Sequence, residues 1–197
     1  MIFVAIIDDI KGGYAMRRKT DLDYCKEVAK ALANIKIKKC DNISPCLACF
    51  HPVLESSVAC VEIDGKNQFL DVYNNKKNFQ LFVAQTGQFI DSLDSVRRIT
   101  TNVIRKSYRL TYLDMIWSAL SEEDAGTLLS LCWTDSENAN LDANVSLDTI
   151  IGYFNEIPKK YLMTTEEIRE YEALEDKITV YRGIGSKSNK EGLSWTI

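Results

Sequence analysis

Residues 58 to 93 read VACVEIDGKNQFLDVYNNKKNFQLFVAQTGQFIDSL, and this stretch decides the fold because it contains the change from β to α structure. Its first half predicts two strands, residues 58 to 63 and 68 to 73, because the intervening Asp64-Gly65 pair tolerates the positive φ of a tight turn. The polar residues 74 to 77 then interrupt the pattern, and apolar residues recur at helical spacing beyond them. The sequence therefore predicts a β-hairpin followed by helices, with a domain boundary at residues 74 to 77.

The residues before the hairpin predict a small α/β unit. Residues 1 to 7 are apolar and β-branched and end at a pair of aspartates, as in a buried strand followed by a loop. Thr20 with Asp23 resembles a capping box, and apolar side chains follow it at helical spacing, so a helix is predicted from about residue 21 to about residue 35. This unit spans residues 1 to 75, and its sequence predicts no role for it.

The residues after the boundary predict a mainly helical region. Three apolar stripes have the spacing of buried helix faces: Phe79, Phe82, Val83, Phe89, Ile90 and Leu93; Val96, Ile99, Val103 and Ile104; and Leu110, Leu113, Met115, Ile116 and Leu120. Three further helices are predicted to begin at N-cap signals: Ser121 with Asp124, Ser146, and Thr164 with Glu167. Residues 178 to 181 are β-branched and aromatic and predict a strand. We therefore predict an α+β protein in which residues 76 to 197 form a helical region that leads into the first strands of a sheet.

Composition and charge weigh against several classes of protein. The chain has 197 residues, of which 46 % are hydrophobic and 26 % are charged, and its net charge is −4. Nucleic-acid binders usually carry a basic excess, so nucleic acid is not predicted as a partner. No run approaches the roughly 18 to 20 apolar residues that span a bilayer, and the apolar start lacks the basic leader of a signal peptide. We therefore expect no membrane association and a cytoplasmic protein. Its cysteines should be core thiols or metal ligands rather than disulfides; they are Cys25, Cys40, Cys46, Cys49, Cys60 and Cys132.

A group of basic residues on the predicted helices allows two interpretations. Its members are Arg97, Arg98, Arg105, Lys106 and Arg109, with Tyr108 and Tyr112 among them. Such a stripe suits contact with nucleic acid or phosphate. The acidic residues 122 to 124 weaken the positive electrostatic potential of this group, and we favour the interpretation of a solvated helix face.

Cysteine and histidine residues raise the question of a metal site. Cys40, Cys46, Cys49 and His51 have the spacing C-x5-C-x2-C-x-H, which would suit three thiolates and an imidazole around zinc. Only Cys46 and Cys49 resemble a zinc knuckle and the segment is apolar, so we predict core thiols and no metal. His51 is the only histidine and is interpreted as a polar loop residue, which leaves no histidine for a catalytic pair elsewhere.

The most informative residues for function follow the last predicted strand. Arg182 stands directly after this strand, where the sheet would hold its guanidinium and let it bind a phosphate through two parallel hydrogen bonds. Gly183 would let a ligand approach the backbone closely. Beyond the polar loop of residues 185 to 192, Ser194 and Thr196 alternate around an indole and therefore share one face of a strand.

These residues carry a resemblance to a known superfamily. Tyr181-Arg182-Gly183 and Ser194-Trp195-Thr196 resemble the "YRG … SWT" core of bacterial and phage proteins related to the arginine–serine–glutamate ADP-ribosyltransferases. Three upstream stretches fit the same group: residues 131 to 137, 161 to 163 and 165 to 167. The resemblance covers about residues 128 to 197 and nothing in residues 1 to 75.

The resemblance implies that NAD is the cofactor. In that superfamily the strand arginine binds the NAD phosphates, the serine supports the nicotinamide half, and a glutamate in a third motif stabilises the oxocarbenium ion. Carried over, Arg182 takes the first role and Ser194 the second, with Thr196 in support and Gly183 meeting the nicotinamide amide. Tyr181 and Trp195 complete the two motifs. The third motif has no counterpart before Ile197, and we expect a truncated chain with little or no transferase activity.

The predicted function is therefore that of a phage-associated, ADP-ribosyltransferase-like protein whose intact relatives bind NAD and modify an acceptor such as a protein. The first alternative is a non-enzymatic interaction module in which the helices present a surface to a partner protein. The second is a zinc-stabilised module at residues 40 to 60 that binds protein or nucleic acid.

Overall fold

The computed structural model describes residues 19–39, 49–136 and 144–175, and this part of the chain is α+β, as predicted. The strands predicted at residues 1 to 7 and 178 to 181 lie outside the described residues. The described α-helices are α1 (Leu22–Ala33), α2 (Lys76–Ser92), α3 (Val96–Asn102), α4 (Arg109–Ile116), α5 (Glu122–Asp135), α6 (Leu147–Glu156) and α7 (Thr165–Glu172). The described 3-10 helices are η1 (Lys106–Tyr108), η2 (Trp117–Ala119) and η4 (Lys159–Tyr161). The strands form two antiparallel pairs, β1 (Lys38–Lys39) with β2 (Cys49–Phe50) and β3 (Val58–Ile63) with β4 (Lys66–Asp71).

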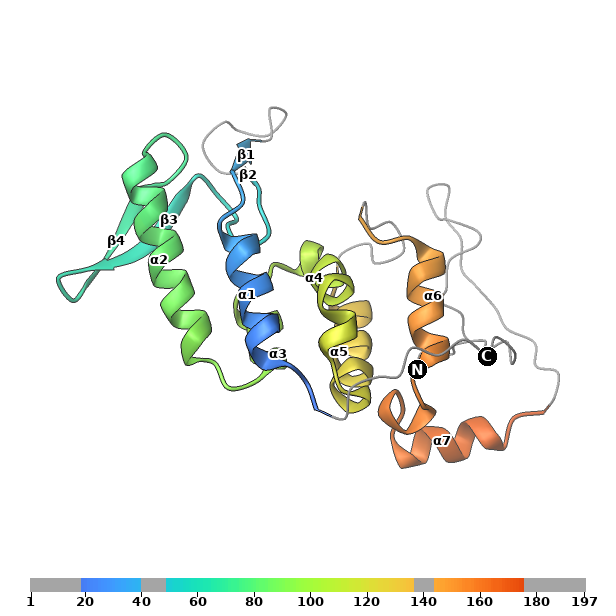
Figure 1. Cartoon of the computed structure of the whole chain (residues 1–197). Coiled ribbons are helices and arrows are strands. Elements are labelled where there is room, and N and C mark those ends of the chain that lie inside the picture. The colour runs from blue at the N-terminus through green and yellow to red at the C-terminus, as the bar shows by residue number, and fades with distance from the viewer. Residues whose placement is uncertain (1–18, 40–48, 137–143, 176–197) are drawn as a thin grey trace, which may run out of the picture.

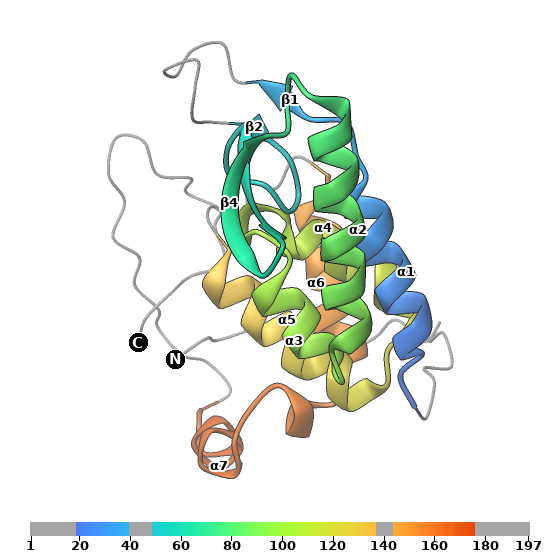
Figure 2. The same cartoon turned by 90° about the vertical axis from the view of Figure 1, so that its left-hand side faces the viewer.

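The elements lie side by side in an order that places α1 near the middle. Figure 1 shows the β3–β4 hairpin, α2, α1, the α4–α5 pair and α6 in succession across the molecule, with α7 crossing below α6. In Figure 2, turned by 90°, α1 and α2 again lie next to each other. Helix α1 contacts α2 on one side and α3 and α4 on the other. The first described helix is therefore part of the central packing rather than of a separate appendage.

The hairpin forms as predicted, with a tighter turn. Asp64 and Gly65 have φ values of 52° and 72°, the two positive values of a two-residue turn, so β4 begins at Lys66 instead of residue 68. Ala59 and Val61 point toward α2 and are buried, whereas Cys60 is exposed beside its cross-strand partner Phe69. One face of the hairpin is thus core and the other face is surface.

Two hydrophobic clusters hold the described elements together. The smaller one, which we call the hairpin core, consists of Ile37, Leu54, Ala59, Val61, Val72 and Phe82. The larger one, the helical core, is built from α1, the end of α2, and α3 to α6. Helix α2 supplies Phe82 to the hairpin core and Ile90 to the helical core. Elements before and after residue 75 therefore contribute side chains to both cores. The predicted division into two domains at that residue stays a prediction.

Local capping signals were used to predict four helix starts, and three of these predictions are correct. The hydroxyls of Ser121, Ser146 and Thr164 each accept a hydrogen bond from the backbone N–H three residues on, and Thr164 completes a capping box with Glu167. The capping box predicted at Thr20 is wrong. Asp21 caps α1 instead, and the Thr20 hydroxyl donates to Asp124 at the start of α5.

Gly126 on α5 provides a direct test of how α5 packs against η4. A Cβ atom at Gly126 would lie 2.6 Å from Tyr161 Cβ and 2.7 Å from the Tyr161 carbonyl oxygen, so the backbone of η4 would have to shift. We expect Gly126→Ala to lower the free energy of unfolding by about 2 kcal/mol through overpacking. Urea denaturation followed by circular dichroism measures this change.

Gly152 in the interior of α6 is the matched control, because a Cβ atom there meets nothing within 4 Å. Gly152→Ala should raise stability by up to about 1 kcal/mol, the difference in helix propensity between the two residues. Equal effects of the two substitutions would show that α5 does not approach η4 as closely as described.

None of the described helices combines the length and the apolar character that crossing a bilayer requires.

Candidate functional site

The residues predicted for the NAD site lie outside the described part of the chain. They are Tyr181, Arg182, Gly183, Ser194, Trp195 and Thr196. The polar site that the structure does describe is formed by residues that precede them in the sequence.

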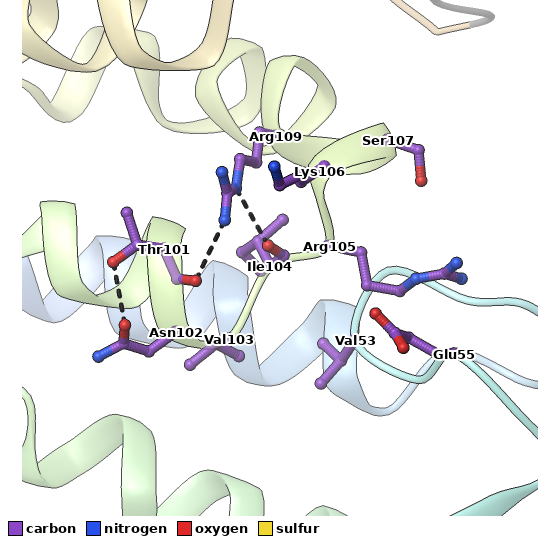
Figure 3. Close-up of a pocket in the computed structure, with 10 residues that line it drawn as sticks. All are labelled: Val53, Glu55, Thr101, Asn102, Val103, Ile104, Arg105, Lys106, Ser107 and Arg109. Atoms are coloured by element: carbon purple, nitrogen blue, oxygen red, sulfur yellow. Dashed lines mark hydrogen bonds between the residues drawn. The ribbon is translucent and has the colours of Figure 1, made fainter. Parts of the chain in front are cut away.

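A polar cleft of about 350 Å³ opens where α3 ends and α4 begins (Figure 3). It is lined by Val53, Glu55, Thr101, Asn102, Val103, Ile104, Arg105, Lys106, Ser107 and Arg109. The chain turns here through an extended residue, Arg105, and the short helix η1 before it enters α4. The cleft thus brings together three cations of the predicted basic stripe and the loop that precedes β3.

Arg109 is buried, and its guanidinium occupies the end of α3. Its Nε donates to the carbonyls of Thr100 (3.2 Å) and Ile104 (3.3 Å), and its Nη2 donates to the carbonyl of Thr101 (3.1 Å). Carbonyl groups at the end of a helix lack intrahelical partners and carry partial negative charge, so a cation here both satisfies and stabilises them. Its Nη1 pairs with the carboxylate of Asp135 at the end of α5. Arg109 therefore joins two helix ends.

Arg105 joins the same turn to the loop that leads into the hairpin. Its backbone N–H donates to the Pro52 carbonyl at 2.9 Å, and its Nη1 donates to the carbonyls of His51 (3.3 Å) and Leu54 (3.0 Å). Figure 3 shows the Glu55 carboxylate on the same side of the cleft as this guanidinium. Arg105 thus links the helical core to the hairpin core.

The interpretation of the basic stripe as a solvated helix face is wrong for two of its members. Arg109 is buried and Arg105 is half-buried, because both guanidiniums bind backbone carbonyls. Arg97, Arg98 and Lys106 are exposed, as predicted. Lys106 nevertheless pairs with Asp135 at 2.7 Å, so the Asp135 carboxylate receives two cations.

His51 is fully buried, which corrects its interpretation as an ordinary polar loop residue. Its Nδ1 accepts hydrogen bonds from the backbone N–H groups of Val53 (3.1 Å) and Leu54 (2.9 Å). The ring proton is therefore on Nε2, which donates to the Ile35 carbonyl at 3.0 Å. Burial, and to a lesser degree the nearby Arg105 charge, lower the pKa of His51. The neutral imidazole joins the end of α1 to the loop before β3.

The engagement of both ring nitrogens bears on the zinc hypothesis. An imidazole binds a metal through a ring nitrogen with a free lone pair, and in His51 the Nδ1 lone pair already receives two N–H groups. Within residues 19–39, 49–136 and 144–175, no group of three or more potential metal ligands is present. Cys40 and Cys46 lie outside these ranges, and the side chain of Cys49 is not described either.

The described cysteines divide into two environments. Cys25 and Cys132 are buried in the helical core, as predicted, and burial raises the pKa of Cys132 to about 12. Cys60 is exposed on the outer face of the hairpin, so the prediction of a core thiol is wrong there. The outward direction of the Cys60 side chain follows from the alternation along the strand, since Ala59 and Val61 on either side of it are buried.

In the described cleft, Arg105 and Arg109 act as structural joints. Its two guanidiniums bind main-chain carbonyls, and the one histidine of the chain is neutral, buried and bonded through both nitrogens. General acid–base catalysis needs a titratable group free to exchange a proton with a substrate. Both arginines and the histidine are instead committed to holding the fold together.

Comparisons of the chain with protein-family models, with curated proteins and with solved structures find no match in any of the three. The resemblance to ADP-ribosyltransferases therefore rests on the motif residues themselves.

Proposed function

We propose that the chain carries the NAD-binding part of an ADP-ribosyltransferase-like site, with Arg182 on the NAD phosphates and Ser194 beside the nicotinamide half. The observation that carries the proposal is the pairing of Tyr181-Arg182-Gly183 with Ser194-Trp195-Thr196 in one short segment. Arginine is suited to this role because its planar guanidinium binds a phosphate through two parallel hydrogen bonds.

Helix α6 and the short helix η4, which precede the motif segment in the sequence, pack against the rest of the described structure. The Trp117 and Tyr153 rings stack at 3.8 Å between centroids, and Trp117 Nε1 donates to Glu156 at 3.0 Å. The Tyr153 hydroxyl donates to Asp114 at 2.5 Å. These contacts tie α6 to α4 and η2, and the close approach of Tyr161 to Gly126 ties η4 to α5. Helix α6 and η4 are thus held in place, whereas α7, which follows them, has no buried residue.

The proposal concerns the binding of NAD and not its turnover. The superfamily mechanism also uses a glutamate of a third motif to stabilise the developing oxocarbenium ion, and the proposal assigns that role to no residue of this sequence. Electrostatic stabilisation of this kind is usually the largest catalytic contribution. Binding of NAD and its turnover should therefore be separable.

Calorimetric titration of the 197-residue chain with NAD tests the proposal. We expect weak binding, with a Kd on the order of 1 mM, and at least tenfold weaker binding by Arg182→Ala, since a lost charge-assisted pair costs about 1.5 to 3 kcal/mol. Lys187→Ala is the matched control: it removes one positive charge from the loop beyond Arg182 but none from the motif. Equal NAD affinity of the wild-type and Arg182→Ala chains, or no binding by either, would end the proposal.

A second candidate function, a protein-interaction module, is favoured by the outer face of the hairpin. Phe69 is 79 % exposed and lies opposite the exposed Cys60, with the half-exposed Val58 on the same face. The sequence predicts a partner surface on the helices, and the structure exposes large apolar side chains both there, at Tyr24, Phe89 and Met115, and on the hairpin. This candidate would be favoured if the folded chain does not bind NAD and if the substitution Phe69→Ser abolishes its binding to a partner protein.

A further inference from the structure

A second cavity, larger than the polar cleft, borders the hairpin core at Ile37 and Val72. It has a volume of about 520 Å³ and lies between the end of α1, the end of β4 and the start of α2. Figure 1 shows why these segments meet: α1 and α2 run in opposite directions, so the end of one and the start of the other lie at the same end of the pair. The cavity is lined by Asn34, Lys36, Ile37, Val72, Tyr73, Asn74, Lys76 and Phe79.

The floor and walls of this cavity are apolar and aromatic. Ile37 and Val72 are buried members of the hairpin core. Phe79 packs against the same core and meets the His51 ring edge-on at 6.4 Å, so its ring is held in place. Tyr73 is 40 % exposed at the mouth. Two aromatic rings and an apolar floor within a volume of a few hundred Å³ are typical of sites for small planar molecules.

The rim of the cavity is cationic. Lys36 and Lys76 are exposed, and among the described residues neither has a carboxylate within ion-pair distance. The nearby Asp71 carboxylate is occupied by the backbone N–H groups of Tyr73 and Asn74 at 3.0 and 2.9 Å. The first turn of α2 contains lysines and no acidic residue, the reverse of the preference that stabilises a helix start. Stability of α2 therefore does not explain Lys76.

We propose that this cavity binds a small phosphorylated compound with a planar ring, of the chemical class of a nucleoside monophosphate. The ring lies against Tyr73 and Phe79 over the apolar floor, and the phosphate is bound by the ammonium groups of Lys36 and Lys76. The two parts of the cavity match the two parts of such a ligand: aromatic side chains stack on bases, and lysine binds phosphate as a point charge. This site is separate from the NAD site proposed around Arg182.

Titration with adenosine monophosphate, adenosine and inorganic phosphate tests both halves of the proposed site. We expect saturable binding of adenosine monophosphate at one equivalent per chain, and at least tenfold weaker binding of adenosine and of phosphate, because each lacks one half of the interaction. Tyr73→Ala, at an exposed position, should weaken binding of adenosine monophosphate without lowering the melting temperature. Equal affinity for adenosine and adenosine monophosphate, or no saturable binding of the nucleotide, would overturn the proposal.

Paired lysine variants locate the phosphate. The double variant Lys36→Gln/Lys76→Gln should bind adenosine monophosphate at least tenfold more weakly than wild type. The matched control Lys66→Gln/Lys77→Gln removes the same charge from exposed positions that do not line the cavity and should bind as wild type does. Arg182→Ala should leave this binding unchanged. Loss of binding in Arg182→Ala with retention in Lys36→Gln/Lys76→Gln would assign the nucleotide to the proposed NAD site and overturn the assignment to this cavity.

Discussion

Arg109→Ala is expected to lower the free energy of unfolding by about 3 to 5 kcal/mol, the range measured when one partner of a buried ion pair is removed. The substitution leaves the carbonyls of Thr100, Thr101 and Ile104 without their donor at the end of α3. It also removes the contact between that helix end and Asp135 on α5. A domain of ordinary stability has only about 5 to 15 kcal/mol in total, so the variant should unfold at much lower urea concentration. Urea denaturation followed by circular dichroism measures the loss.

Two control variants separate the parts of this effect. Asp135→Asn removes the carboxylate but keeps the three hydrogen bonds from Arg109 to carbonyl groups. Because Asp135 also contacts solvent and Lys106, we expect the free energy of unfolding to fall by less, about 1 to 2 kcal/mol. Arg98→Ala removes an exposed arginine that pairs with Asp94, four residues earlier on the surface. Such pairs are worth about 0.3 to 0.5 kcal/mol. A loss below about 1 kcal/mol for Arg109→Ala would contradict its role in joining the two helix ends.

Features determined by a few neighbouring residues could be predicted from the sequence. The turn at Asp64-Gly65 and the caps at Ser121 and Ser146 each depend on three or four consecutive residues, and the structure confirms them. Thr20 has an equally good local pattern, and yet the prediction there is wrong. Its hydroxyl lies beside the start of α5, about a hundred residues further along the chain, and bonds there instead.

Most members of the predicted helical stripes are buried or partly buried, with two exceptions. Phe89 and Met115 belong to the predicted stripes but are 46 % and 44 % exposed. In the β part, one edge of the hairpin is closed by Gln85, whose side-chain amide bonds both backbone groups of Glu62. Hydrophobic spacing identifies the buried face of an element but not how far its partners extend along it, so these details required the tertiary structure.

Two buried polar residues, Arg109 and His51, were interpreted wrongly for a physical reason. Arginine and histidine are most often exposed, and nothing near Arg109 in the chain reveals that Asp135 and the end of α3 converge on it. The neighbours of His51 in the sequence likewise indicate a loop residue, although Ile35 and Leu54 place hydrogen-bonding groups on both sides of its ring. Buried polar residues are paired through long-range contacts, which a single sequence does not display.

His51→Ala is the second substitution for which we expect a large effect, a loss of about 3 kcal/mol at neutral pH. It leaves the backbone N–H groups of Val53 and Leu54 and the Ile35 carbonyl without their partner, and each buried unsatisfied group costs about 1 to 3 kcal/mol. His51→Asn should lose less, since its carboxamide oxygen can accept in place of Nδ1. Denaturation of both variants beside the wild type at pH 7.5 measures the two losses.

The same residue should make stability depend on pH, and the sign follows from its pKa. The unfolded imidazole titrates near pH 6.5, whereas burial lowers the pKa of His51 in the folded state. Between these two values the unfolded chain binds the extra proton, so stability falls as the pH drops below about 6.5, by at most about 1.4 kcal/mol per pH unit. Protonation would place a second N–H at Nδ1, against the Val53 and Leu54 N–H groups that donate to it. His51→Asn lacks the titrating group, so its stability difference from wild type should shrink between pH 7.5 and pH 5.5. A difference that stays constant over that range would show that the folded and unfolded pKa values of His51 are equal.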